Sequence, residues 1–203
     1  MGTAAATKQI YYKGVLAMKV VLELLAQHNQ GVKDDHIICA KLDADATVSD
    51  SDYEAQLTAK EIPYEGYTPT ETAVNRLPHP VDLLSEAVLT DLVEQINARI
   101  TDLRTITAKL DADAGVAGAD YSDEATAKRI TALGETYTSA ADLPALFEGA
   151  GSGGAGKVLQ AMIEQHNTLV QDWHNVCAKL DADAGVTDTD YEAQLSQKVI
   201  SQF

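Results

Sequence analysis

A seven-residue segment, Ala-Lys-Leu-Asp-Ala-Asp-Ala, occurs three times in the chain, at Ala40–Ala46, Ala108–Ala114 and Ala178–Ala184. The spacings between successive copies are 68 and 70 residues. Around the first and last copies, Val20–Leu57 and Val158–Leu195 align without gaps and share 23 of 38 residues. This degree of identity indicates duplication, and each copy is expected to form one supersecondary unit that packs against its neighbours.

Each copy begins with apolar residues at helical spacing. In the third copy the stripe consists of Leu159, Met162, Ile163, His166, Leu169, Val170, Trp173, Val176, Cys177 and Leu180. In the second copy it consists of Leu89, Leu92, Val93, Ile96, Ile100, Leu103, Ile106 and Leu110. The first copy keeps most of the stripe but has Gly31 and Asp35 at positions where apolar residues are expected. The spacing predicts amphipathic helices of about six turns.

Each long helix is expected to end at its Asp-Ala-Asp-Ala segment. Gly115 and Gly185 follow this segment in two copies and favour the left-handed conformation that ends helices, whereas the first copy has Thr47. After the turn, Thr189 and Glu192 have the spacing of a capping box, which predicts the start of a second helix. The expected unit is therefore a helix-turn-helix.

The predicted fold is all-α, with three repeated helix-turn-helix units in bundle or coiled-coil-like packing. The expected divisions are 1–70 for the first repeat with its connector, 71–148 for the second repeat, and 149–203 for a linker with the third repeat. The first connector, Glu61–Pro80, holds four of the five prolines and should be extended. The second ends in the Gly-rich stretch Gly149–Gly156, which has the composition of a flexible linker.

Composition restricts the function. With 45% hydrophobic residues the chain can bury a core, and its net charge of −16 argues against nucleic-acid and membrane surfaces as partners. The longest apolar stretch, Gly14–Ala26, is interrupted by charges and is too short to span a bilayer. No secretory signal is evident, and two cysteines do not make a disulfide framework, so folding in a reducing cytoplasm is expected.

Two motifs suggest ligands and have simpler interpretations. The stretch from Gly151 to Lys157 resembles a phosphate-binding P-loop, but Val158 replaces the hydroxyl residue that should hold magnesium, so we interpret it as a linker. Acidic clusters that could bind calcium are Asp43 and Asp45 with Asp50 and Asp52, Asp181 and Asp183 with Asp188 and Asp190, and Asp111, Asp113 and Asp120. They lack EF-hand spacing, and helix capping and turn formation are favoured over calcium binding.

Histidines and cysteines recur at equivalent positions. His28 and His166 fall on the apolar stripe, and His36 and His174 follow eight residues later, so a metal site is conceivable, but a polar core layer or solvated histidine is favoured. Cys39 and Cys177 correspond to Thr107, which suits a small buried residue better than a nucleophile. The sequence offers no coherent catalytic, cofactor or metal constellation, and we expect no enzyme.

The residues expected to matter most pack the turn. They are Leu42, Leu110 and Leu180 at the ends of the stripes, Tyr53, Tyr121 and Tyr191 after the turns, and Trp173 on the third stripe. Each leucine should pack near the tyrosine of its own copy, and Trp173 is expected in the core, with an exposed anchoring role as the alternative. Truncating a buried leucine to alanine should cost about 2–5 kcal/mol, against about 1 kcal/mol for one capping carboxylate.

The third copy carries a resemblance to a known class. Lys179-Leu-Asp-Ala-Asp-Ala-Gly-Val-Thr-Asp-Thr-Asp-Tyr191, preceded by His166-Asn167-x-Leu169-Val170, resembles a segment of virion structural proteins from tailed bacteriophages. The likeness covers the three repeats, and the first two copies depart from it at the turn. It implies a non-enzymatic component of the particle.

The expected function is a capsid decoration, cement or head-fibre protein that acts by protein–protein contacts in the virion after assembly in the host cytoplasm. A tail or neck protein and a calcium-dependent binding module are the alternatives. Capsid or other virion proteins are the expected partners. Exposed stripes on long helices also predict a homo-oligomer, with a trimer as the favoured form, unless the three helices of one chain cover one another.

Overall fold

The computed structural model describes residues 3–62, 86–130 and 154–200. Within these residues the helices are α1 (Thr3–Ala44), α3 (Glu86–Ala112) and α5 (Gly154–Ala182), and no strand is present. A short 3₁₀ helix follows each of them: η1 (Glu54–Gln56), η3 (Tyr121–Glu124) and η6 (Glu192–Gln194). The described part of the chain is therefore of the all-α class, as the sequence predicts.

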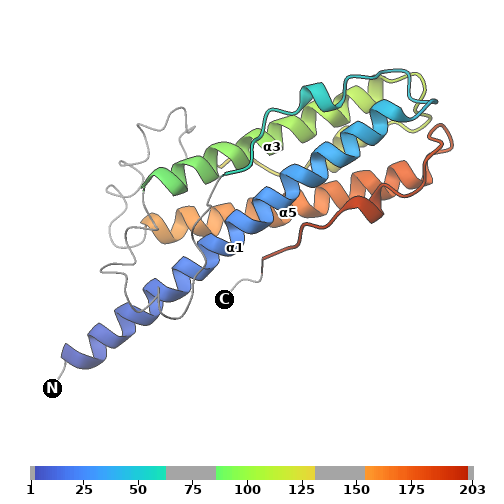
Figure 1. The fold of residues 1–203 in the computed structure, drawn as a ribbon. Coiled ribbons are helices and arrows are strands. Elements are labelled where there is room, and N and C mark those ends of the chain that lie inside the picture. The colour runs from blue at the N-terminus through green and yellow to red at the C-terminus, as the bar shows by residue number, and fades with distance from the viewer. Residues whose placement is uncertain (1–2, 63–85, 131–153, 201–203) are drawn as a thin grey trace.

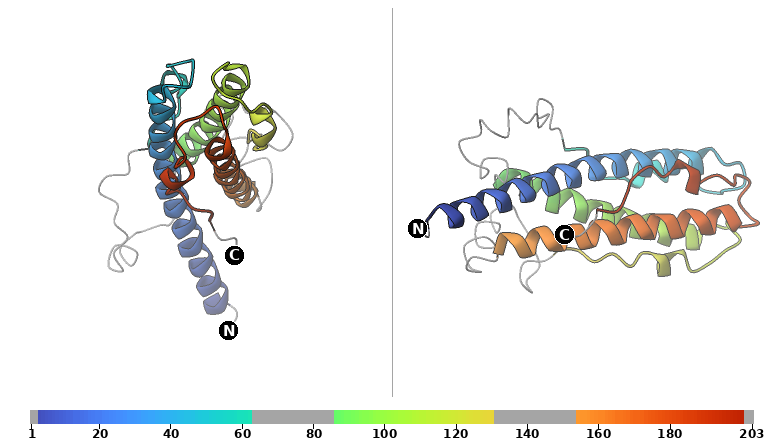
Figure 2. Two further views of the ribbon diagram at one scale, coloured as in Figure 1. Left: turned by 90° about the vertical axis from the view of Figure 1, so that its right-hand side faces the viewer. Right: turned by 90° about the horizontal axis from the view of Figure 1, so that it is seen from below.

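The three α-helices lie side by side, with their aspartate turns together at one end (Figures 1 and 2). Along one seam of each helix, buried residues recur at spacings that alternate between three and four residues. From α1 these are Leu24, His28, Gly31, Asp35, Ile38 and Leu42; from α3, Leu92, Ile96, Arg99, Leu103, Ile106 and Leu110; from α5, Met162, His166, Leu169, Trp173, Val176 and Leu180. Equivalent residues of the three helices define six successive levels of the core, because this spacing keeps one seam of each helix facing the others.

The second helix expected in each copy does not form. Leu57–Ile62, Ala125–Ile130 and Leu195–Ile200, which we call the return segments, have no regular secondary structure and run back along the helices (Figure 1). At Tyr191 no side-chain cap bond is present, so the predicted capping box of Thr189 and Glu192 is also wrong. The reason is that amides of the return segments donate to side chains of other elements, so they are not available for helical hydrogen bonds.

The glycines after the helices serve a different purpose from the predicted one. Neither Gly115 nor Gly185 has a left-handed φ, and the only positive φ among described non-glycine residues is 73° at Asp120. A Cβ at Gly115 would overlap the backbone carbonyl of Thr47, and one at Gly185 would lie 2.5 Å from the amide nitrogen of Ala117. Glycine is needed here because the turn of one copy touches the turn of another.

Other expectations concern the ends of the elements. Helix α1 begins at Thr3, well before the first stripe, and α5 begins at Gly154, inside the stretch interpreted as a linker. Lys157 of the P-loop-like stretch therefore lies in α5, and Gly151 lies outside the described residues. Apart from its first two residues, the Pro-rich connector also lies outside them.

Candidate functional site: a ring of aspartate turns

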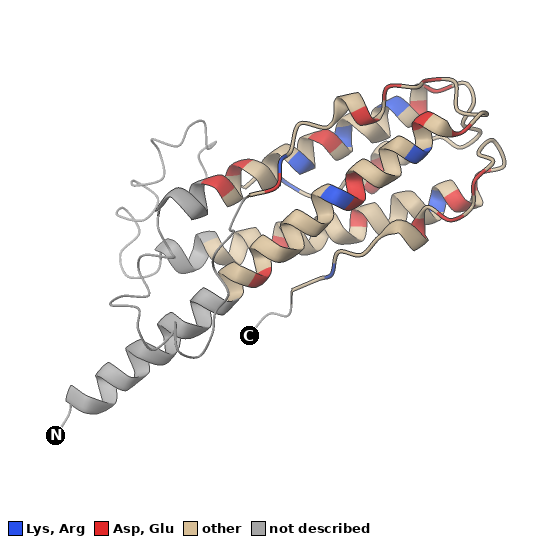
Figure 3. Ribbon diagram, in the orientation of Figure 1, with Lys and Arg blue, Asp and Glu red and all other residues tan. Residues whose placement is uncertain are grey.

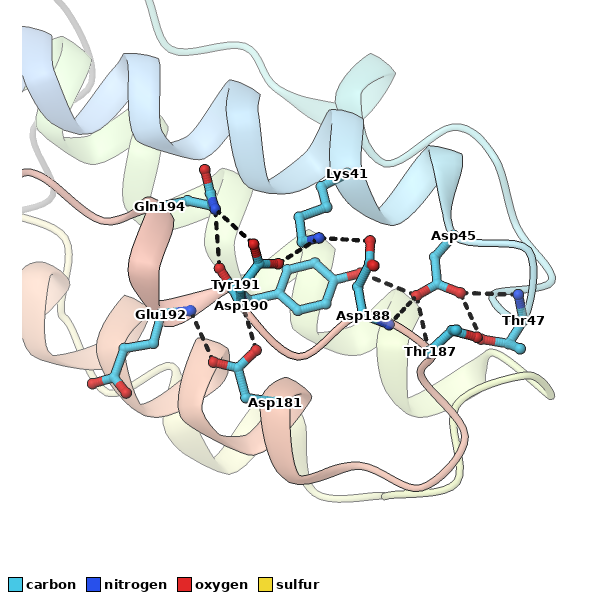
Figure 4. Close-up of polar contacts among 10 residues, drawn as sticks. All are labelled: Lys41, Asp45, Thr47, Asp181, Thr187, Asp188, Asp190, Tyr191, Glu192 and Gln194. Atoms are coloured by element: carbon cyan, nitrogen blue, oxygen red, sulfur yellow. Dashed lines mark hydrogen bonds and ion pairs between the residues drawn. The ribbon is translucent and has the colours of Figure 1, made fainter.

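The first aspartate of each Asp-Ala-Asp segment caps the 3₁₀ helix of its own copy. The carboxylate of Asp43 accepts hydrogen bonds from the amides of Tyr53 at 2.7 Å and Glu54 at 3.0 Å. Asp181 does the same for the amides of Tyr191 and Glu192 (Figure 4). In the second copy, Asp111 binds the amides of Tyr121 and Ser122. These bonds fold the chain back sharply after each helix.

The second aspartate binds a different copy. Asp113 accepts hydrogen bonds from the amides of Ser49 at 2.9 Å and Asp50 at 3.0 Å and from the hydroxyl of Tyr53 at 2.9 Å, all in the first copy. It also accepts a hydrogen bond at 2.8 Å from the amide of Gly115, which follows it by two residues. One buried carboxylate therefore holds its own turn and fastens the turn of the preceding copy.

The same pattern recurs at the other two second aspartates, Asp183 and Asp45. Asp183 accepts the amides of Ala117 and Gly118 and the hydroxyl of Tyr121 in the second copy. Asp45 accepts the amides of Thr187 and Asp188, at 3.1 Å each, and the hydroxyl of Tyr191, at 3.5 Å, in the third copy (Figure 4). The second copy thus holds the first, the third holds the second, and the first holds the third. The three turns form a closed ring.

Hydrogen bonding fixes the charge of the ring. Burial opposes ionisation of Asp113, but the amides of Gly115, Ser49 and Asp50 outweigh it and lower the pKa of Asp113 to about 2. For Asp45 the balance is the same: burial opposes ionisation, and the bonds from Thr47, Thr187 and Asp188 lower its pKa to about 2. Burial and the Asp113 carboxylate raise the pKa of Tyr53, so its hydroxyl remains a donor.

A lysine reinforces each junction from the outside. The ammonium of Lys41 lies 2.5 Å from Asp188 and 2.7 Å from Asp190, and 4.9 Å from the centre of the Tyr191 ring (Figure 4). Lys109 binds Asp50 and Asp52 in the same way, above Tyr53. Lys179 lies above Tyr121, where Gly118 stands in place of the first of the two acidic residues.

The return segments extend the ring along the helices. The amides of Thr58 and Ala59 donate to Asp102 of α3, those of Thr126 and Ala127 to Asp172 of α5, and those of Ser196 and Gln197 to Asp34 of α1, all at 2.7–2.8 Å. Each segment is also tied to its own helix, as in the pairing of Ile62 with Asn29. Each return segment therefore joins its own helix to the next.

A central polar cluster interrupts the apolar core. The guanidinium of Arg99 is fully buried and binds Asp35 through Nε at 2.7 Å and Nη2 at 2.8 Å, and Nη2 also donates to Gln197 at 2.9 Å. A Cβ at Gly31 would overlap the guanidinium. The two gaps in the first apolar stripe, Gly31 and Asp35, are thus the space and the charge that accommodate Arg99.

The packing residues predicted from the sequence are all buried. Leu42, Leu110 and Leu180, Tyr53, Tyr121 and Tyr191, and Trp173 each have 0% of their surface exposed. The tyrosines contact the aspartate of another copy through their hydroxyls, which the sequence analysis did not anticipate. Trp173 lies in the core and not on the surface.

The fold directs the residues of each candidate ligand site to different partners. Asp43 and Asp45 bind backbone amides of different copies, whereas Asp50 and Asp52 bind Lys109. Across the described ranges, no group of three or more His, Cys, Asp or Glu side chains is placed to hold a metal ion. His28 and His166 are buried, whereas His36 and His174 pair with Glu54 and Glu192 nearer the surface. Cys39 and Cys177 are buried, and burial raises the pKa of both thiols.

Several residues of the ring escaped the sequence analysis although a signal was present. Asp34, Asp102 and Asp172 occupy equivalent positions in the three copies, as do Gln27, Gln95 and Gln165, which accept the amides of Lys198, Lys60 and Lys128. A polar residue that is identical in every copy and lies beside the apolar stripe indicates a contact that every copy makes.

We expect the protein to lose stability in acid in two stages. Burial, aided by the charge of Arg99, lowers the pKa of His28 from 6.5 to about 3 and that of His166 from 6.5 to about 4. A histidine whose pKa is lowered in the folded state contributes stability above pH 6.5. This stability is lost as the pH falls toward 4 and 3, because the unfolded state binds protons at a higher pH than the folded state. Asp45 and Asp113 contribute stability above pH 3.8 that is lost as the pH falls through 2.

Urea unfolding at a series of pH values measures both stages. The double variant His28→Ile/His166→Ile, which copies Ile96 of the second copy, should lack the first stage and keep the second. An unchanged first stage in this variant would show that other groups cause it.

No protein-family model, curated protein or solved structure matches the chain. Among the described helices, none has the length and apolar character needed to cross a membrane.

Proposed function

We propose that the chain is a non-enzymatic structural component of a tailed-bacteriophage particle, acting by protein–protein contacts in the virion. A capsid decoration, cement or head-fibre protein is the favoured role. Two lines of argument support it: the resemblance of Lys179–Tyr191 and its upstream residues to virion proteins, and the use that the structure makes of the repeated residues.

The closed ring of second aspartates carries the proposal. The repeated motif contributes three second aspartates, Asp45, Asp113 and Asp183. The carboxylate of each accepts hydrogen bonds from amide and hydroxyl groups of this chain. A motif whose carboxylates bind other parts of the same chain makes that chain rigid. Rigidity is what a protein that braces or decorates a shell requires.

The arrangement also suggests how the chain arose and associates. We infer that duplication placed three coiled-coil-like units in one chain, so that one molecule does what a homotrimer of single units would do. The apolar stripes that predicted a trimer of chains are buried against one another within one chain. Acidic residues are spread along the described helices and turns (Figure 3), and the net charge is −16. Contacts with virion partners would then use an acidic exterior, which suits basic or mixed surfaces.

The alternatives differ in their support. A tail or neck protein needs the same rigid unit and remains the close alternative. A calcium-dependent module is less well supported, because the carboxylates of the acidic clusters are taken by amides and by Lys41 and Lys109.

Fractionated phage particles test the proposal. An antibody against the chain should detect it in gradient-purified particles of the phage that encodes it, at a fixed ratio to the major capsid protein. In particles separated into heads and tails it should follow the heads; recovery with the tails would favour the alternative placement. Recovery only in the soluble fraction of the lysate would contradict a virion role.

A further inference from the structure

Several buried polar atoms near the middle of the core have no hydrogen-bond partner among the described residues. They are the Nδ1 atoms of His28 and His166, Nη1 of Arg99, Nε1 of Trp173 and Nε2 of Gln197. Both histidines and Arg99 have fully buried side chains and occupy two adjacent levels of the core. A buried polar group without a partner is destabilising, so a group of them indicates that something else binds there.

The backbone determines which nitrogen of each histidine carries hydrogen. Nε2 of His28 lies 3.1 Å from the carbonyl oxygen of Lys60, and Nε2 of His166 lies 3.2 Å from that of Lys198. A carbonyl oxygen can only accept, so in each neutral ring Nε2 carries the hydrogen. Each buried Nδ1 therefore carries a lone pair and can only accept a hydrogen bond.

Arg99 supplies the matching donor. Its Nε and Nη2 are taken by Asp35 and Gln197, which leaves Nη1 on the opposite edge of the guanidinium. Nη1 is the guanidinium atom nearest to Gly31, which lies one turn after His28 and one turn before Asp35 on α1. The influence of Arg99 on the pKa of both histidines agrees with this proximity.

We propose that one internal water molecule occupies the core between Arg99, His28 and His166, accepting a hydrogen bond from Nη1 and donating one to each Nδ1. The two hydrogens of water match the two lone pairs, and three bonds are typical of a buried water. The third residue of the histidine level is Ile96, so no further acceptor competes. Gly31 leaves the guanidinium space to lie in the core.

Other occupants fit the same atoms poorly. An anion would be attracted by Arg99 but would face two lone pairs, and a metal cation would lie beside the guanidinium charge. The water would supply a partner for Nη1 and both Nδ1 atoms, and it is independent of any role of the chain in a virion.

Crystals of the full chain that diffract to side-chain resolution, one set grown with bromide, test the proposal. We expect a water peak about 2.7–3.2 Å from Nη1 and from both Nδ1 atoms, without anomalous bromide signal. Nitrogen-15 spectra should show both histidines as neutral Nε2–H tautomers. A bromide peak, a direct bond from Nη1 to either Nδ1, or an Nδ1–H tautomer in either ring would overturn it.

Matched variants give a second readout in solution. Water-to-protein cross-relaxation at the amides near the histidine level should be present in the wild type and in the control His36→Ile, whose side chain lies near the surface. It should disappear in His28→Ile/His166→Ile, which removes both acceptors. Persistence of the signal in the double variant would show that the histidines do not hold the water.

Discussion

Replacing Arg99 by leucine should lower the free energy of unfolding by about 3–5 kcal/mol, because it leaves the Asp35 carboxylate buried without its partner. Leucine already occupies the equivalent position of the third copy, Leu169, so the replacement is compatible with the core. Burial raises the pKa of Asp35 and the guanidinium of Arg99 opposes this, so in the variant the pKa of the carboxyl should rise further. Urea unfolding at pH 7 measures the loss.

A double-mutant cycle separates the ion pair from general packing. Asp35→Leu copies Leu103 of the second copy, and alone it should also destabilise the protein, because Arg99 is then left unpaired. The double variant Arg99→Leu/Asp35→Leu should recover most of the loss, because neither charge remains buried. Losses that simply add in the double variant would show that the two residues act independently, contrary to the structure.

Asp113→Ala should destabilise the protein about as much as Leu110→Ala, for which about 2–5 kcal/mol is expected. The sequence-based ordering, with leucines far above aspartates, treated each aspartate as a local cap. Asp113 instead accepts four hydrogen bonds, three of them from the first copy, and a single bond to a charged group contributes about 1.5–3 kcal/mol. Urea unfolding of the two variants compares the losses.

Amide hydrogen exchange shows where the effect of Asp113→Ala acts. Protection of the amides of Ser49 and Asp50, more than 60 residues away in sequence, should fall. Asp123→Ala, at an exposed aspartate of η3, is the control and should change stability by less than about 0.5 kcal/mol. A loss of about 1 kcal/mol in Asp113→Ala, with exchange altered only around Gly115, would restore the local-cap interpretation.

The sequence was sufficient for the helices and much of the core, because these depend on short-range periodicity. The stripe that ends at Leu42, Leu110 and Leu180 and the burial of Trp173 follow from apolar residues recurring every three to four positions. Arg99 was overlooked because the same rule treats a charged residue as outward-facing. Arg99 lies on the 3–4 spacing between Ile96 and Leu103. Its burial could have been predicted from this position, because the first stripe has matching gaps at Gly31 and Asp35.

The second helix was wrongly predicted for a related reason. Thr189 and Glu192 have helix-starting chemistry, but the choice between a helix and a return segment depends on acceptors elsewhere in the chain. Asp34, on α1, takes the amides of Ser196 and Gln197, and no local pattern reveals a partner 162 residues away. Long-range side chain to backbone bonds are the part of this fold that local propensity cannot supply.

The three copies close into a ring within one chain. Sedimentation equilibrium of the full chain at micromolar concentrations, combined with urea unfolding over the same range, tests it most directly. We predict the mass of a single chain and an unfolding midpoint independent of protein concentration, because the apolar stripes are covered internally. A trimer whose midpoint rises with concentration would contradict the claim and show that the copies find their partners in other chains.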